Sequence, residues 1–195
     1  MNARSFCLLL SVVLAIGTTS VLFAAPAEPG TYRNWKGEID EVVVNRPFRA
    51  DDYQDIVVEP LDITKVTVPQ RKGESRPATI ALLPSLKTAF MDGLQKNLRR
   101  RTPVSRAAGK ALVIRVHLTK ADPGTRNPDF GDFQANAAKL AVSGEVIDPA
   151  SNLVLIQFKQ QRWSGVVSIG KTSAQLLEDA ARMIGTDVAH LISAY

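Results

Sequence analysis

The sequence contains one cysteine and two histidines among 195 residues. The cysteine, Cys7, lies within an apolar N-terminal run, and the rest of the chain has none. Without further thiols, that remainder cannot form a disulfide framework, a thiolate zinc site or a cysteine nucleophile. The histidines, His117 and His190, show neither H-x-H nor H-E-x-x-H spacing, so we expect no metal site and no cofactor.

Motifs typical of dinucleotide binding and of serine hydrolases are also lacking. The chain has neither a G-x-G-x-x-G nor a G-x-S-x-G pattern. The acidic loop "ADPGTRNPDFGD", with Asp122, Asp129 and Asp132, lacks the spacing and the bidentate Glu of an EF-hand. We therefore expect a protein that is not an enzyme. The alternative is a small hydrolase in which His117 or His190 acts as a base on a serine brought near by folding.

The N-terminal run "CLLLSVVLAIGTTSVLFAA" follows Arg4, the only charge before it, and leads to an A-x-A pattern ending at Ala27. This is typical of a secretory signal peptide over residues 1–27, with Glu28 as the first mature residue. Cys7 stands too early to be the lipid-modified cysteine of a lipoprotein. We expect a periplasmic or secreted protein without a lipid anchor. The alternative is a retained membrane anchor, since the run approaches the roughly 20 residues that span a bilayer.

Residues 28–52 are mixed in character and predict an N-terminal arm, whereas residues 53–195 predict one α+β domain. The apolar stretch Ile56–Val58 indicates a buried strand that Pro60 ends or places at a sheet edge. Helical spacing of three and four then follows. It joins Leu83, Leu86, Phe90, Leu94 and Leu98, with Pro84 as the first helical residue.

Three alternating segments follow, which predict strands over 111–122, through 138–146 and through 154–163. Between the last two, "IDPASNL" reads as a hairpin turn, in which Asp148 caps the turn and Asn152 tolerates a left-handed backbone. Thr172 and Gln175 form a candidate capping box for a final helix. These elements predict an antiparallel or mixed sheet of about four strands with two helices packed on one face.

The strand pair carries a weak motif, "GEVIDPASNLVL", of the form G-x-x-x-D-x-x-(T/S)-(G/N)-x-x-L. With this motif and the element order from Tyr53 to Leu191, the chain resembles uncharacterised bacterial envelope families of small exported proteins and lipoproteins. Those families are similar in architecture to auxiliary lipoproteins of outer-membrane transport machines. The resemblance implies a binding or assembly role and no known site residues, and the chain departs from the lipoprotein members in lacking the lipidated cysteine.

The expected partner is a protein or another component of the cell envelope, not a nucleic acid, because the formal charge of only +5 is a mild excess. The face of the sheet away from the helices would present Arg115, His117 and Thr119 on one strand and Lys139, Ser143 and Glu145 on the next. Candidate partner-binding residues on or beside this face are Tyr32, Trp35, Arg115, His117, Lys139 and Trp163. Both tryptophans could instead be core residues.

A second candidate surface is basic and would bind anionic lipid or polysaccharide at the membrane periphery. Its residues are Arg99, Arg100, Arg101, Arg106 and Lys110. The alternative for the arginine run is a solvated helix end, where cations favour the helix dipole. The sequence predicts no oligomeric state.

Overall fold

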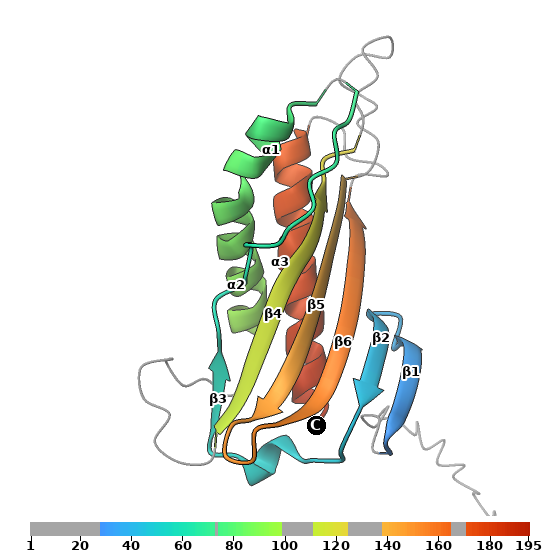
Figure 1. Ribbon diagram of the computed structural model, residues 1–195, viewed down its shortest axis with the longest axis vertical. Helices are drawn as coiled ribbons and strands as arrows, with labels where there is room; N and C mark the ends of the chain where they lie inside the picture. The colour runs from blue at the N-terminus through green and yellow to red at the C-terminus, as the bar shows by residue number, and fades with distance from the viewer. Residues whose placement is uncertain (1–27, 73, 99–110, 125–137, 165–170) are drawn as a thin grey trace, which may run out of the picture.

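The structure is a computed structural model that describes residues 28–72, 74–98, 111–124, 138–164 and 171–195. The described residues form one mixed sheet with the strand order β1-β2-β6-β5-β4-β3 (Figure 1). Only β3 and β4 are parallel; the other neighbouring strands are antiparallel. The strand bounds are β1 Gly30–Trp35, β2 Ile39–Val44, β3 Asp55–Val58, β4 Ala111–Asp122, β5 Ala138–Asp148 and β6 Leu153–Ser164.

The α+β class is confirmed, but the expectation of about four strands and two helices was wrong. Six strands and three α-helices occur in the described residues: α1 Arg76–Ala81, α2 Leu83–Asn97 and α3 Ser173–Ser193. A 3-10 turn, η1, spans Ala50–Asp52. Helix α1 begins at the Ser75 cap and has only six residues, too few to show a helical period in the sequence.

The two further strands come from the segment expected as an arm. Strand β1 is exposed along most of its length, so apolar and polar residues do not alternate clearly in it. Its turn into β2 uses positive φ at Asn34, Lys36 and Gly37, and β2 then pairs with β6. The segment thereby extends the sheet at one edge. The predicted signal peptide, residues 1–27, lies outside the described residues.

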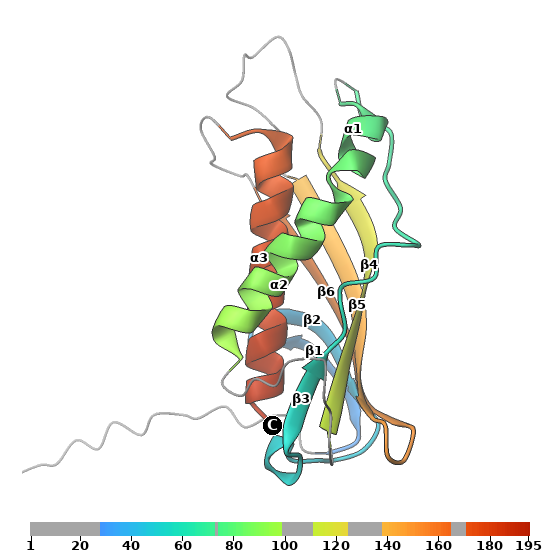
Figure 2. The same cartoon turned by 90° about the vertical axis from the view of Figure 1, so that its left-hand side faces the viewer.

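Helices α2 and α3 cover one face of the sheet, as Figure 2 shows from the side. Leu112, Ile114 and Val116 of β4 are buried on that face, and Leu86 and Phe90 of α2 are fully buried against the same core. The predicted helical and alternating patterns are confirmed in these elements. The other face of the sheet carries no helix among the described elements, and we call it the open face.

Two glycines allow α2 and α3 to cross at backbone distance. A Cβ added to Gly185 of α3 would overlap the carbonyl oxygen of Phe90 and lie 2.8 Å from the amide nitrogen of Leu94. A Cβ on Gly93 of α2 would overlap the carbonyl oxygen of Arg182. Gly185, which costs helix propensity, is therefore required for close packing.

The local signals at the turns and caps are confirmed. Asp148 accepts hydrogen bonds from the Ala150 amide at 3.0 Å and the Ser151 hydroxyl at 2.8 Å, and Asn152 has a φ of 54°. Thr172 and Gln175 form the capping box of α3. The cluster at "DPASN" is thus a chain reversal.

Strand β3 is an edge strand that ends at Val58, before Pro60, as predicted. The chain after it continues along β4 through two isolated parallel bridges, Asp62 with His117 and Thr67 with Lys120. This irregular extension places Asp62 beside the open face. In the part of the chain that the structure describes, no helix combines the length and apolarity that a membrane crossing requires.

Candidate functional site

The open face carries a row of polar residues that crosses the whole sheet. Each member is the Cα partner of the next, or forms a bridge with it, and charges of opposite sign alternate over much of the row. From β1 to the extension after β3 the row reads Arg33, Glu41, Lys159, Ser143, His117 and Asp62. Ser143 and His117 were expected on this face, and the register places them there.

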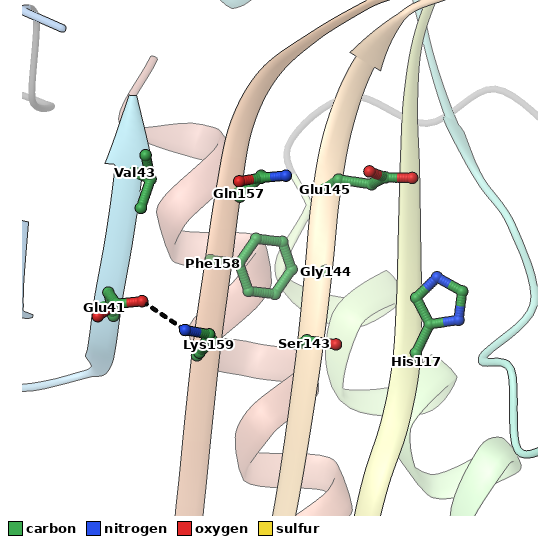
Figure 3. Close-up of a pocket in the computed structure, with 9 residues that line it drawn as sticks. All are labelled: Glu41, Val43, His117, Ser143, Gly144, Glu145, Gln157, Phe158 and Lys159. Carbon is green, nitrogen blue, oxygen red and sulfur yellow. Dashed lines mark hydrogen bonds and ion pairs between the residues drawn. The ribbon is translucent and has the colours of Figure 1, made fainter. Parts of the chain in front are cut away.

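A shallow hollow of about 290 Å³ lies across the middle of this row (Figure 3). The outward side chains of β2, β4, β5 and β6 surround it, and Gly144 and Phe158 lie between them. A Cβ on Gly144 would collide with the Phe158 ring, with 2.7 Å to Cε1. The remaining lining residues are Glu41, Val43, His117, Ser143, Glu145, Gln157 and Lys159.

The wall of the hollow nearest β2 is an ion pair. Lys159 Nζ lies 2.8 Å from Glu41 Oε1, and the hydrogen bond from Lys159 lowers the pKa of the Glu41 carboxyl. Lys159 is nevertheless 70% exposed, so its ammonium still faces solvent above the sheet. The wall is therefore charged and accessible, with a cation that a second carboxylate can reach.

The opposite wall holds His117, whose Nδ1 lies 2.9 Å from Asp62 Oδ2. Hydrogen bonds from Thr64, and to a lesser extent one from His117, lower the pKa of Asp62 to about 2. Ser143 is the Cα partner of His117, yet no hydrogen bond joins the two side chains in the described residues. Figure 3 shows the imidazole on the side of β4 away from Ser143.

This histidine, aspartate and serine therefore do not form a catalytic triad in the described residues. Nucleophilic catalysis needs the base at hydrogen-bond distance from the hydroxyl. It also needs donors aimed at the developing oxyanion, whereas the backbone of Ser143 is committed to the ladder between β4 and β5. The site suits charge pairing and hydrogen bonding better than proton transfer.

Arg115, a candidate partner-binding residue, is already held by two carboxylates. Its guanidinium lies 2.8 Å from Glu59 and 3.0 Å from Glu145, which come from either side of β4. The hydrogen bond with Glu59 raises the pKa of Arg115, and the hydrogen bond with Arg115 in turn lowers the pKa of Glu59. Arg115 on β4 thus connects β5, through Glu145, with the segment after β3, through Glu59.

The two tryptophans have different environments. Trp163, at the far end of β6, is 55% exposed on the open face, and Lys139 Nζ lies 4.6 Å from its ring centroid. Trp35 is only 8% exposed, because β1 joins the sheet and carries the indole into the core. Tyr32 is partly buried against the core, and its hydroxyl donates to the Glu28 carbonyl. Of the three candidate aromatics, Trp163 alone is largely exposed.

The basic candidates Arg99, Arg100, Arg101, Arg106 and Lys110 lie outside the described residues. Asp122 of the acidic loop is buried and is held by Arg71 and by Lys120, with 3.1 Å between Lys120 Nζ and its carboxylate. Asp129 and Asp132 again lie outside the described residues. Within the described ranges, no group of three or more His, Cys, Asp or Glu could hold a metal ion.

The second histidine belongs to α3 and lies beside the turn between β1 and β2, apart from the hollow. His190 Nδ1 is 3.3 Å from both carboxylate oxygens of Glu38, which stands at the turn between β1 and β2. No serine hydroxyl is hydrogen-bonded to this imidazole among the described contacts. His190 therefore has a carboxylate partner without a nucleophile.

Gln157 and Lys159 of the hollow, and Asp62 beside His117, were absent from the sequence-based site. Gln157 and Lys159 could have been predicted from the alternation of β6, since they share a face with Trp163. Asp62 was not readable, because an irregular bridge outside any regular strand brings it to His117.

No protein-family model and no curated protein matches the chain. Among solved structures it is similar to the PelC dodecamer from Paraburkholderia phytofirmans, with 8% identity and a TM-score of 0.42 over 75% of this chain and 96% of that one. A Xanthomonas campestris protein assigned to DUF330 matches with 15% identity and a TM-score of 0.39, over 70% and 82%. A candidate lipoprotein from Caulobacter crescentus matches with 11% identity and a TM-score of 0.34, over 71% and 90%. At these values the matches assign neither family nor function.

Proposed function

We propose that this chain is a non-enzymatic protein of the bacterial cell envelope that binds a protein partner on the open face of its sheet. The observation that carries the proposal is the polar row through the hollow, with its alternating charges and exposed Lys159. Complementary charges across an interface fix its register and exclude wrong partners. A rigid sheet holds this pattern at fixed spacing.

The chemistry of the face favours a protein over a small substrate. The hollow is shallow and open to solvent, and three charged side chains, Glu41, Glu145 and Lys159, line it, whereas sites for small molecules are mostly enclosed and apolar. Trp163, exposed at the end of the same face, adds the aromatic side chain that is enriched at protein interfaces. The envelope location rests on the predicted signal peptide over residues 1–27, followed by a chain without cysteine.

Site-specific photo-crosslinking in intact cells tests this proposal. A photoreactive amino acid replaces Gln157 on the open face, and in a matched variant it replaces Glu178 on α3. We expect a discrete crosslinked protein from position 157 and none from position 178. Equal crosslinking at the two positions, or a crosslink only at 178, would refute binding by the open face.

The hydrogen bond between Asp62 and His117 is the one observation that favours the hydrolase alternative. A fluorophosphonate probe distinguishes the two functions, since it labels only serines activated by a base. We expect no labelling of Ser143 in the folded protein. Labelling of Ser143 that disappears in a His117→Ala variant would replace the binding proposal by hydrolysis.

A further inference from the structure

Strand β6 extends beyond the strand that pairs with its outer side. The pairing of β2 with β6 runs from Val44 with Ile156 to Glu41 with Lys159, whereas β6 continues to Ser164 and pairs with β5 over that whole length. Among the described residues, no strand pairs with the outer side of Gln161–Ser164. We call this stretch the β6 notch. Figure 1 shows the β1–β2 hairpin beside only part of β6.

The hydrogen bonds between neighbouring strands determine which way the backbone N–H and C=O groups point at the notch. The carbonyls of Ile114 and Val116 accept from the Glu59 and Asp62 amides, so these residues of β4 face away from β5. Groups alternate along antiparallel strands, and residues of a hydrogen-bonded pair face each other. Ser143, the partner of His117, therefore faces β4.

The same alternation then fixes β6. Gly144 and Val142 face β6, and their partners Phe158 and Gln160 face β5. It follows that Gln161 and Trp163 direct both N–H and C=O into the notch. The Leu155 carbonyl, which accepts from the Asn45 amide on the β2 side, agrees with this phase.

The side chain of Gln160 explains why the pairing of β2 with β6 ends at Glu41. The Gln160 amide accepts from the Asp40 backbone N–H at 3.0 Å and donates to the Glu38 carbonyl, so it takes the place of further ladder bonds. Asp187 of α3 holds the same amide at 2.9 Å. The hairpin is thereby satisfied without covering the edge beyond Gln160.

The two sides of the notch present different chemistry. On the open face, Trp163 is exposed, and the Lys139 ammonium lies over it with no carboxylate within 4 Å in the described residues. On the other side, Met183 of α3 is 43% exposed. It lies one helical turn before Asp187, whose carboxylate binds Arg162 of β6 at 2.7 Å, and so it projects from the same side of α3.

We propose that the β6 notch binds an extended segment of a partner protein as an added strand, antiparallel to β6 and in line with β2. Its backbone pairs with Gln161 and Trp163. Because side chains of a strand alternate between faces, an apolar one lies toward Met183 and an acidic one toward Lys139. Strand addition of this kind gains affinity from main-chain hydrogen bonds and specificity from alternate side chains.

This inference deepens the proposed function, since it names the conformation and charge of the partner segment. It concerns a different set of contacts, however. A Gln161→Pro substitution removes the N–H that faces the notch and keeps the ladder with β5, as proline is tolerated where the N–H faces away from a strand. The hollow at Lys159 is unchanged by it, so loss at the notch and loss at the hollow are distinguishable.

The probe is an acetylated and amidated peptide of alternating valine and glutamate, seven residues long, titrated into the purified protein and followed by amide hydrogen exchange. We expect saturable binding that slows exchange at Gln161 and Trp163. Binding is expected to remain in Gln161→Thr, which keeps the N–H, and to be lost in Gln161→Pro. The same peptide with lysine in place of glutamate should bind more weakly.

Several outcomes would overturn the proposal. Absence of binding, or equal binding by Gln161→Pro, would show that the edge does not accept a strand. Equal binding of the lysine peptide would remove the acidic requirement. Self-association of the wild-type protein that is lost in Gln161→Pro would make a second copy of this chain the occupant instead of a partner segment.

Discussion

Replacing Gly185 with alanine tests the close crossing of α2 and α3, the two helices that cover one face of the sheet. In an isolated helix this change would stabilise by about 1 kcal/mol, because glycine is a poor helix former. Here the new methyl group would overlap the Phe90 carbonyl and press on the Leu94 amide. Both obstacles are backbone atoms of α2, so no side-chain rotation relieves them.

The expected net effect is a loss of stability. Overpacking of a core costs about 1–3 kcal/mol, and rigid backbone obstacles favour the upper end of that range. After the gain in propensity, Gly185→Ala should lower the free energy of unfolding by about 2 kcal/mol. For a chain of this size, that corresponds to a fall in Tm of roughly 4–8 °C.

Urea unfolding followed by circular dichroism and by tryptophan fluorescence measures this difference. Gly93→Ala should behave alike, because its methyl group would overlap the Arg182 carbonyl. The control Glu178→Ala, on the same helix, should change stability by no more than about 0.5 kcal/mol. A Gly185→Ala protein as stable as the wild type would show that the two helices do not cross at this distance.

Four further results are expected. Asp148→Ala should cost about 1–2 kcal/mol in urea unfolding, because it removes the turn cap and the hydrogen bond with Tyr53, and it should leave partner binding intact; lost binding in a folded variant would contradict the turn assignment. Asp187→Ala should cost about 3 kcal/mol, since it leaves Arg162 without its partner in a largely buried pair, and a cost below about 1 kcal/mol would oppose this. The hydrogen bond from Arg71 lowers the pKa of Asp122, so its stabilisation is complete above the ordinary pKa of an aspartate and declines as pH falls below about 4; Asp122→Asn should flatten that acid dependence in unfolding experiments, and an unchanged pH profile would refute the link. In fluorescence, acrylamide should quench one of the two tryptophans, and Trp163→Phe should leave only blue-shifted, protected emission; a persistent quenchable component would mean that the other indole is exposed.

Much of the fold was predictable from local patterns. Regular alternation located β4, β5 and β6, because each buries one face against the helices and turns the other outward. The capping residues Thr172 and Gln175 marked the start of α3 by chemistry that acts within one helical turn. The outward positions of Arg115, His117 and Ser143 followed from the same alternation.

What could not be predicted depends on pairing between distant segments. The sequence of β1 carries little apolar pattern, since its stability in the sheet comes from β2 and the core contact of Trp35. For the same reason the sequence could not predict the exposure of the two tryptophans. Trp35 lies in the core, whereas Trp163 is exposed on the open face. Asp62 reaches His117 through an irregular bridge, and the ion pair of Glu41 with Lys159 requires the register of β2 on β6. The spacing of residues in the sequence predicts neither contact.

The central claim is that a partner protein recognises the charge pattern of the open face. The measurement that tests it most directly is the crosslinking yield from position 157 in a protein with Glu41→Lys and Lys159→Glu combined. This exchange keeps an ion pair between β2 and β6, so the fold is retained while the charge pattern that faces the partner is reversed. We predict that the crosslink is lost although the protein remains folded. A yield equal to that of the wild-type charges would show that the pair only joins two strands, and it would contradict recognition by this face.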